Sequence, residues 1–191
     1  MKISILGKGN VGSALREGFL REGHEVLAIG RGAEAVREAG AFGDIIVFAL
    51  PFEAIDEAVA ELGNSASGKI VIDATNLVTP DLKLAAGFTT SGAEELQKKL
   101  PKAKVVKAFN TAFATTMSTG HVQGEQLVGL VAGDDETAKK TVLELVAGLG
   151  FDPVDVGPLE NARLLEPLAV LVIRLGLVQK YGPLIGVRFV H

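Results

Sequence analysis

The stretch that decides the fold of this chain is Ile3-Ser4-Ile5-Leu6-Gly7-Lys8-Gly9-Asn10-Val11-Gly12. Its first residues are typical of a short buried strand, because branched apolar side chains suit a pleated surface. Gly7, Gly9 and Gly12 then follow with the spacing G-x-G-x-x-G. In a dinucleotide-binding turn the first glycine permits the tight turn, the second leaves room for a pyrophosphate, and the third lets the next helix pack against the strand. We therefore expect residues 7–12 to bind dinucleotide phosphates at a helix N-terminus.

An amphipathic helix follows these glycines. Its apolar residues recur at the spacing of one helix face, and its charged residues take the other face. The apolar set is Val11, Ala14, Leu15, Gly18 and Phe19. Together, the preceding strand and the following helix favour a dinucleotide site over the alternative, a glycine-rich turn with only a structural role.

The second expected strand, residues 25–29, ends at Gly30 and Arg31. At this junction an NAD site usually places Asp or Glu, which accepts a hydrogen bond from the ribose 2′-hydroxyl. The planar, permanently charged guanidinium of Arg31 suits a 2′-phosphate instead, so we expect NADP rather than NAD. The alternative is a solvated Arg31 that begins the helix expected over residues 32–39. Lys8 either adds positive charge near the phosphates or lies in solvent.

Strand and helix patterns alternate along the rest of the chain. Strands are expected over residues 44–50, 69–73, 104–108, 126–132 and 151–156, and helices over 53–62, 93–100 and 137–149. This alternation predicts an α/β fold, a Rossmann-type doubly wound and mostly parallel sheet with a C-terminal apolar helix extension. We expect an NADP-binding domain over residues 1–156 and an extension over 157–191. Residues 77–92 are expected to form a loop, and the acidic residues 134–136 to cap a helix rather than bind a metal.

Further candidate site residues follow the carboxyl ends of the expected strands, where open α/β sheets bind ligands. They are Leu50 and Pro51 after one strand, Ala74, Thr75 and Asn76 after the next, and Asn110 after a third. We expect these loops to meet the nicotinamide or its ribose. Turn chemistry of the Asn and Thr side chains is the alternative.

The composition excludes several classes of function. The chain has 191 residues, a net charge of −4, no cysteine and three scattered histidines. Disulfides, thiol catalysis and cysteine-ligated metals are excluded, and neither a histidine metal site nor nucleic-acid binding is expected. No stretch approaches the ~20 apolar residues of a membrane span, and we expect no signal peptide, because the first strand pattern begins at residue 3. We expect a cytoplasmic protein with no membrane contact.

The C-terminal extension differs from the rest. A helix is expected to open at residues 157–160 and to run to about Tyr181, and its apolar residues lie all round it. Such a helix must be buried, so we expect a homodimer in which the partner subunit covers it; the alternative is a helix packed on its own sheet. Arg163 and Glu166 have the spacing of a structural ion pair. Residues 186–190 are expected to form a short strand.

Several motifs in order resemble one family, the NADPH-dependent coenzyme F420 reductases and their bacterial relatives, with the cytoplasmic domain of the STEAP metalloreductases as a more distant member. The resemblance covers essentially the whole chain. It rests on residues 7–12, Gly30-Arg31, Asp73-Ala74-Thr75-Asn76, Val105-Val106-Lys107-Ala108-Phe109-Asn110-Thr111, Ala132-Gly133-Asp134-Asp135, residues 157–166 and Gly186-Val187-Arg188-Phe189. It implies a Rossmann fold, NADP(H), a 2′-phosphate at Arg31, and a nicotinamide beside Pro51, residues 74–76 and residues 109–111.

The resemblance also implies hydride transfer between NADP(H) and a flavin-like or deazaflavin (F420) acceptor. Transfer between two planar rings requires stacking and orientation more than a protein acid or base. No histidine of this chain is convincingly placed as such a group. Two alternatives stay open: a non-catalytic NADP(H)-sensing or partner-binding module, and a reductase of a small imine or carbonyl substrate.

Overall fold

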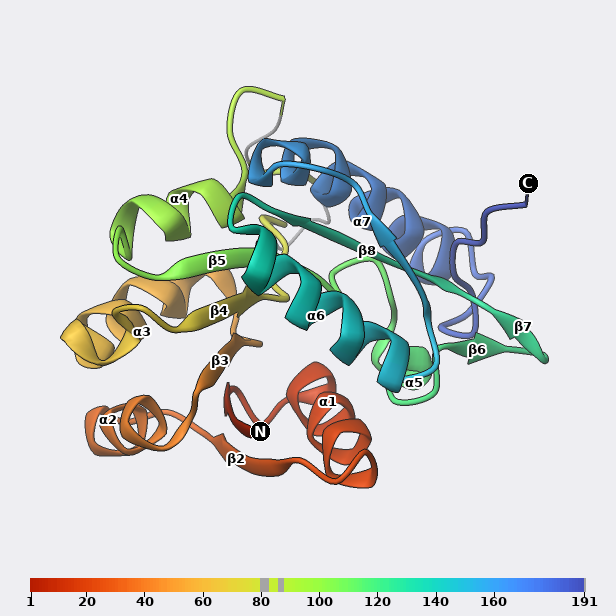
Figure 1. The fold of residues 1–191 in the computed structure, drawn as a ribbon. Coiled ribbons are helices and arrows are strands. Elements are labelled where there is room, and N and C mark those ends of the chain that lie inside the picture. The colour runs from red at the N-terminus through yellow and green to blue at the C-terminus, as the bar shows by residue number, and fades with distance from the viewer. Residues whose placement is uncertain (80–82, 86–87, 191) are drawn as a thin grey trace.

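The computed structural model describes residues 1–79, 83–85 and 88–190 as one seven-stranded sheet flanked by helices (Figure 1). The strand order is β2-β1-β3-β4-β5-β8-β9. These strands are β1 (Lys2–Leu6), β2 (Glu25–Ile29), β3 (Ile45–Phe48), β4 (Ile70–Asp73), β5 (Lys104–Lys107), β8 (Val128–Gly133) and β9 (Asp152–Asp155). A separate hairpin, which the sequence did not predict, consists of β6 (His121–Val122) and β7 (Glu125–Gln126).

The predicted helices are present, with ends that differ by a few residues. They are α1 (Asn10–Arg21), α2 (Ala33–Phe42), α3 (Ile55–Leu62), α4 (Gly92–Lys99), α6 (Glu136–Gly148) and α7 (Ala162–Leu177), together with the short α5 (Ala114–Met117). The side chain of Asp135 accepts a hydrogen bond from the N–H of Ala138, which confirms the predicted cap of α6. No helix within the described ranges is long and apolar enough to cross a membrane.

The chain order creates a switch point at β1. From β1 the chain first adds β2 on one side and then crosses to β3 on the other, and all three strands are parallel. The helices that follow these strands therefore lie on opposite faces of the sheet (Figure 1). In open α/β sheets a crevice forms outside the carboxyl ends of the strands at such a point. This confirms the Rossmann-type prediction and locates the glycine turn at the crevice.

The sheet is mostly, not wholly, parallel. β8 pairs antiparallel with β5, and β9 is parallel to β8. Parallel neighbours need a crossover that returns the chain to the starting edge, usually a long helix. Between β5 and β8 the chain forms only the four-residue α5 and the β6–β7 hairpin, so β8 runs back in the opposite direction.

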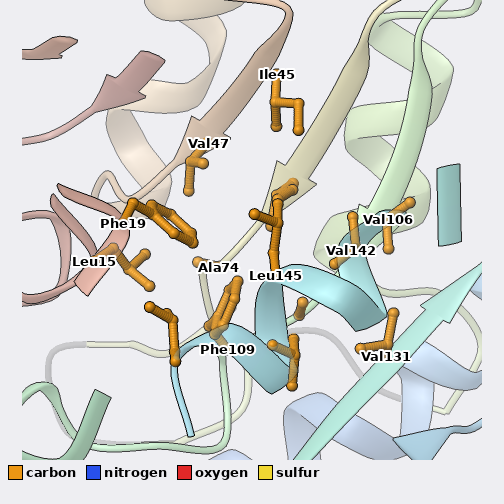
Figure 2. Close-up of a cluster of buried hydrophobic side chains, with 14 of the residues drawn as sticks. Leu15, Phe19, Ile45, Val47, Ala74, Val106, Phe109, Val131, Val142 and Leu145 are labelled. Carbon is orange, nitrogen blue, oxygen red and sulfur yellow. The ribbon is translucent and has the colours of Figure 1, made fainter. Parts of the chain in front are cut away.

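Alternate residues of the central strands fill two separate apolar cores. Ile45 and Val47 of β3 face the core under α1 and α6, where Figure 2 shows them with Leu15, Phe19 and Leu145. Ile46 and Phe48 face the second core, under α2, α3 and α4. Because β3 is buried on both faces, its sequence is a continuous apolar run.

Helix α7 packs on the sheet of its own chain through one face only. Leu165 joins Val128, Leu130 and Ala132 of β8 in a third apolar cluster. The opposite face exposes the large apolar side chains of Leu164, Leu171 and Leu175. The expectation that a partner must bury the whole helix was therefore wrong for the inner face, and a homodimer through the outer face stays a prediction.

Two expectations for the chain's end were wrong. Helix α7 ends at Leu177 rather than near Tyr181, and residues 186–190 form no strand. Val187 accepts one backbone hydrogen bond from Val128, at 2.9 Å. β8 pairs with β9 along one edge and with β5 at the end of the other, and this single bond to the tail does not make a ladder. In the predicted loop 77–92, Val78 and Leu84 form an isolated bridge, while residues 80–82 and 86–87, like His191, lie outside the described residues.

Candidate functional site

The turn between β1 and α1 is fixed by two glycines that the chain's own packing requires. Gly7 is buried with a φ of +126°, and a Cβ on it would lie 2.1 Å from the carbonyl oxygen of Ala49. A Cβ on Gly12 would lie 2.0 Å from the carbonyl oxygen of Gly7. No side chain fits at either position, so both glycines are structural.

Gly9 is different, because nothing in the described chain requires a glycine there. It is exposed, it has an extended φ of −74° and ψ of −170°, and a Cβ on it would have no atom within 4 Å. The space above Gly9 is therefore free for a ligand that approaches the backbone.

The N-terminus of α1 faces this space with features that suit an anion. Gly9 is the N-cap residue, no side chain caps the helix, and its first turn holds no acidic residue. Lys8 and Asn10, on either side of Gly9, are exposed. Free N–H groups, a helix dipole and a lysine together fit a pyrophosphate.

A pocket beside the end of β2, called here the Arg31 pocket, lies between β2, α2 and α3. Gly30, Arg31 and Leu50 line it, as do Ala54 and Glu57 of the next helical segment. Arg31 is exposed, and it has no hydrogen-bond or ion-pair partner within the described part of the chain. Its guanidinium is therefore available to an anionic group of a ligand. Pro51 is exposed and precedes the 3₁₀ turn Phe52–Ala54, outside the lining of this pocket.

A second pocket, the Asn110 pocket, lies where α1, the ends of β4 and β5, and α7 meet. Its walls are mainly apolar: Val11 from α1, Phe109 and Phe113 after β5, and Val172 and Ile173 from α7. Ala74, Asn76, Asn110 and Thr111 also line it. None of the described residues that line it is ionisable. The helix of the C-terminal extension thus forms one wall of the site.

Asn110 is buried in this pocket, and two hydrogen bonds fix the orientation of its side-chain amide. Its Nδ2 donates to Asn76 Oδ1 at 3.0 Å and to the carbonyl oxygen of Leu165 at 3.1 Å. A flipped amide would place its oxygen against these two acceptors, so the orientation is determined. Oδ1 of Asn110 then has no hydrogen-bond partner among the described residues. An unpaired buried acceptor beside a pocket suits a ligand that donates an N–H or O–H.

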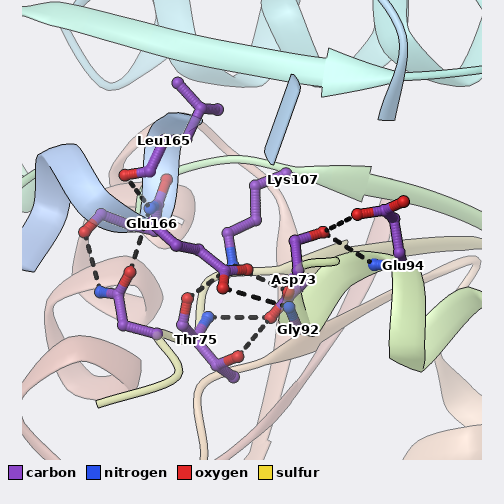
Figure 3. A network of polar contacts seen from close by, with 10 residues as sticks. Asp73, Thr75, Gly92, Glu94, Lys107, Leu165 and Glu166 are labelled. Atoms are coloured by element: carbon purple, nitrogen blue, oxygen red, sulfur yellow. Dashed lines mark hydrogen bonds and ion pairs between the residues drawn. The ribbon is translucent and has the colours of Figure 1, made fainter. Parts of the chain in front are cut away.

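Behind the pocket lies a fully buried ion cluster of Asp73, Lys107 and Glu166, shown in Figure 3. The ammonium of Lys107 lies 2.9 Å from Asp73 Oδ2 and 2.8 Å from Glu166 Oε1, and it donates to the carbonyl oxygen of Thr75 at 2.7 Å. Burial lowers the pKa of Lys107, but the two carboxylates outweigh this effect and hold its pKa above the usual value. Lys107 therefore stays charged inside the protein.

The cluster explains the orientation of Thr75, one of the predicted site residues. Its hydroxyl and its N–H both donate to Asp73 Oδ1, at 2.7 and 2.9 Å, and its carbonyl oxygen accepts from Lys107. Thr75 is therefore turned into the protein. Its neighbours Ala74 and Asn76 face the pocket, and the cluster holds their loop in place.

The predicted ion pair between Arg163 and Glu166 is wrong. Glu166 lies in the buried cluster, and Arg163 instead binds Glu94 of α4 through two hydrogen bonds, at 3.0 and 2.7 Å, and Glu160 at 2.8 Å. No role for Lys107 was predicted from the sequence. A charged residue within a short apolar strand was the available signal, because a buried charge must be paired.

Comparisons with known proteins identify the family of this chain. The family described as "NADP oxidoreductase coenzyme F420-dependent" matches residues 2–77. An F420-dependent NADP reductase of Methanocaldococcus jannaschii is 31% identical over 151 residues, which is 75% of this chain and 67% of that protein. Metalloreductase STEAP3 of Rattus norvegicus is 30% identical over 186 residues, and the match spans 90% of this chain but only 37% of the relative.

A solved structure has the same fold over the whole length of this chain. A protein of Arthrobacter sp. FB24, provisionally named an F420-dependent NADP reductase, superposes with a TM-score of 0.91 at 27% identity, and the match covers 100% of both chains. The C-terminal helix and tail are thus part of the shared architecture.

Proposed function

The chain belongs to the family of coenzyme F420-dependent NADP oxidoreductases, and from this premise we propose that it transfers a hydride between NADP(H) and a planar flavin or deazaflavin acceptor. The observation that carries the proposal is the Asn110 pocket, an apolar space next to the glycine turn whose described lining has no ionisable group. A small carbonyl or imine usually needs a general acid, whereas a flavin-like ring needs stacking and orientation. When bound, NADPH supplies the hydride from its nicotinamide ring, which is left with one positive charge as the acceptor ring is reduced.

Under this proposal, different residues of the chain bind different parts of NADP(H). Gly9 and the first turn of α1 hold the pyrophosphate, with Lys8, Asn10 and Val11 beside it. Arg31 binds the 2′-phosphate of NADP, with Gly30 and Leu50 along the adenosine. Supporting this role, Arg31 is exposed and has no partner in the described chain.

The nicotinamide and acceptor rings are assigned to the Asn110 pocket. Asn110 Oδ1 offers an acceptor to an amide N–H, and Ala74 and Asn76 limit the space at one side. Phe109, Phe113 and Ile173 supply apolar surface and exclude water from the two rings. Here the protein orients two rings at about 3–3.5 Å and takes no covalent part.

The test is an NADPH oxidation assay with coenzyme F420, riboflavin, FMN, FAD, ferric chelates and small carbonyls or imines as separate acceptors. We expect saturable turnover with at least one planar flavin or deazaflavin. Saturable turnover with a small carbonyl or imine alone would replace the acceptor that we propose. NADPH binding without turnover of any acceptor would favour an NADP(H)-sensing module.

We also propose that the chain forms a homodimer through the outer face of α7. Three leucines that share this face are exposed, Leu164, Leu171 and Leu175. A row of large apolar side chains on one helix face is typical of a protein interface. Since the inner face of α7 lines the Asn110 pocket, such a dimer would also support the acceptor site from behind.

A further inference from the structure

The buried cluster of Asp73, Lys107 and Glu166 contains one cation and two carboxylates. All three N–H bonds of the Lys107 ammonium have acceptors: Asp73 Oδ2, Glu166 Oε1 and the carbonyl oxygen of Thr75. The lysine thus uses its full hydrogen-bonding capacity, and it is the one cation of the cluster.

Both carboxylates of the cluster are surrounded by hydrogen-bond donors. Asp73 Oδ1 accepts from the N–H and the hydroxyl of Thr75, and Glu166 Oε2 accepts from the N–H of Gly92 at 3.1 Å. With the two contacts from Lys107, every carboxylate oxygen faces a donor. The ammonium of Lys107 and the N–H groups of Thr75 and Gly92 can only donate, so each carboxylate meets two obligate donors, the environment of an ionised carboxylate. The cluster therefore carries a net charge of −1 with its side chains 0–1% exposed.

This surplus charge lies directly behind the Asn110 pocket. Thr75, which binds both Asp73 and Lys107, stands between the pocket residues Ala74 and Asn76. On the other side, Asn110 donates to the carbonyl oxygen of Leu165, the neighbour of Glu166. The first turn of α4, through Gly92, offsets part of the charge on Glu166. The remaining negative potential reaches the pocket through protein rather than water, and is weakly screened.

We propose that the net negative charge of this cluster makes the Asn110 pocket bind the oxidised, positively charged nicotinamide ring in preference to the neutral reduced ring. The inference rests on the proposed function, which assigns the nicotinamide to this pocket. NADP⁺ and NADPH differ by one positive charge on the ring, so the ratio of their dissociation constants reports the potential there. By linkage, a site that favours the oxidised ring also makes bound NADPH a stronger hydride donor.

The expected size follows from Coulomb's law. For an assumed separation of about 10 Å and an effective dielectric constant of about 20 to 40, a unit charge changes the ratio of the two dissociation constants roughly four- to seventeenfold. Removal of one carboxylate charge should therefore weaken NADP⁺ binding by about this factor and leave NADPH binding nearly unchanged.

The experiment measures the dissociation constants of NADP⁺ and NADPH for the parent protein and for Glu166→Gln, Asp73→Asn and Glu166→Asp. Glu144→Gln is the matched control, because Glu144 is an exposed carboxylate of α6 far in sequence from both pockets. Circular dichroism checks that each variant is folded, and Asp73→Asn serves if Glu166→Gln does not fold. We expect the ratio of Kd for NADP⁺ to Kd for NADPH to rise in the two neutralising variants, and to stay near the parent value in Glu166→Asp and Glu144→Gln.

The outcomes separate the two proposals. A parent protein that binds neither nucleotide would overturn the proposed function and this inference together. A parent that binds both, with folded neutralising variants whose ratio stays within twofold of the parent, would overturn the inference alone. Equal losses of both nucleotides would likewise contradict it, because they indicate that the cluster shapes the pocket without a charge effect.

Discussion

The ammonium of Lys107 lies 2.8 Å from Oε1 of Glu166, and this contact joins β5 to α7 across 59 residues of sequence. It connects the sheet to α7, the helix that forms one wall of the Asn110 pocket. Through Thr75 the same ammonium also holds the loop on the pocket's other side. One buried cation thus fixes two walls of the site relative to each other.

Lys107→Met should strongly destabilise the protein. The substitution keeps most of the side-chain volume but leaves the carboxylates of Asp73 and Glu166 buried without their cation. Removal of one partner from a buried ion pair costs about 3–5 kcal/mol. Urea unfolding at pH 7 measures the loss, with Lys98→Met as control, since Lys98 lies on the surface and should change the free energy of unfolding by under about 1 kcal/mol. A loss for Lys107→Met as small as that of the control would contradict the account of the cluster.

Gly9→Val should leave the protein folded and abolish NADPH binding. The backbone of Gly9 is extended and its Cβ position is open, so valine fits the free protein but occupies the space assigned to the pyrophosphate. Gly12→Val is the contrasting variant: its Cβ would lie 2.0 Å from a carbonyl oxygen, and we expect it to unfold or destabilise the chain. Thermal unfolding and a fluorescence titration with NADPH separate the two effects. Normal NADPH binding by folded Gly9→Val would exclude this turn as the phosphate site.

Arg31→Ala should weaken NADPH binding at least tenfold and change NADH binding less than twofold. Only NADPH carries the 2′-phosphate, and a charge-assisted hydrogen bond to a guanidinium contributes about 1.5–3 kcal/mol. Lys140→Ala is a suitable control, because Lys140 is an exposed cation of α6 outside the lining of both pockets. Equal losses for the two nucleotides would remove the proposed role of Arg31.

The features of this fold that could be predicted from the sequence are those that depend on residues close together in the chain. They are the glycine turn, the alternation of strands and helices, and the Asp135 cap. The expected sheet was right in its parallel part, because each strand is followed by a helix long enough to return the chain.

The buried cluster was not predictable in the same way, because Asp73, Lys107 and Glu166 come from three elements. Helical spacing even favoured a wrong partner for Glu166, since Arg163 lies three residues away. In the fold these two side chains point to different neighbours, α4 and β5, and only the packing of α7 decides this. The unpaired oxygen of Asn110 is also a tertiary property, because Asn76 and Leu165 must first meet its amide group.

The pair between Glu94 and Arg163 should make stability depend on acidic pH. Burial raises the pKa of Glu94, but the hydrogen bonds from Arg163 and Ser91 outweigh it and hold its pKa below the usual value. A carboxyl whose pKa is lower in the folded state stabilises the fold above its unfolded pKa, and this stabilisation is lost as the pH falls through the folded value. We therefore expect the stability difference between the parent and Glu94→Gln to be largest near pH 7 and to shrink below about pH 4.5.

Urea unfolding at a series of pH values between 7 and 3 measures this difference in the free energy of unfolding. The contributions of the other carboxylates are the same in the parent and in Glu94→Gln, so they cancel in the difference. Glu144→Gln should show no such trend, because Glu144 is exposed and has no hydrogen-bond or ion-pair partner to lose among the described residues. A difference for Glu94→Gln that is constant across the series would show that the pair contributes no pH dependence.

Leu171→Glu should convert a homodimer into a monomer without loss of NADPH binding. Leu171 is 54% exposed on the outer face of α7, where a buried charge would have no partner in a dimer interface. Leu20→Glu is the matched control, because Leu20 is 41% exposed on α1, away from this face. Light scattering during gel filtration at micromolar concentration gives the mass of each species. A parent protein that elutes as a monomer would contradict the proposed dimer, and a Leu171→Glu variant that stays dimeric would place the interface elsewhere.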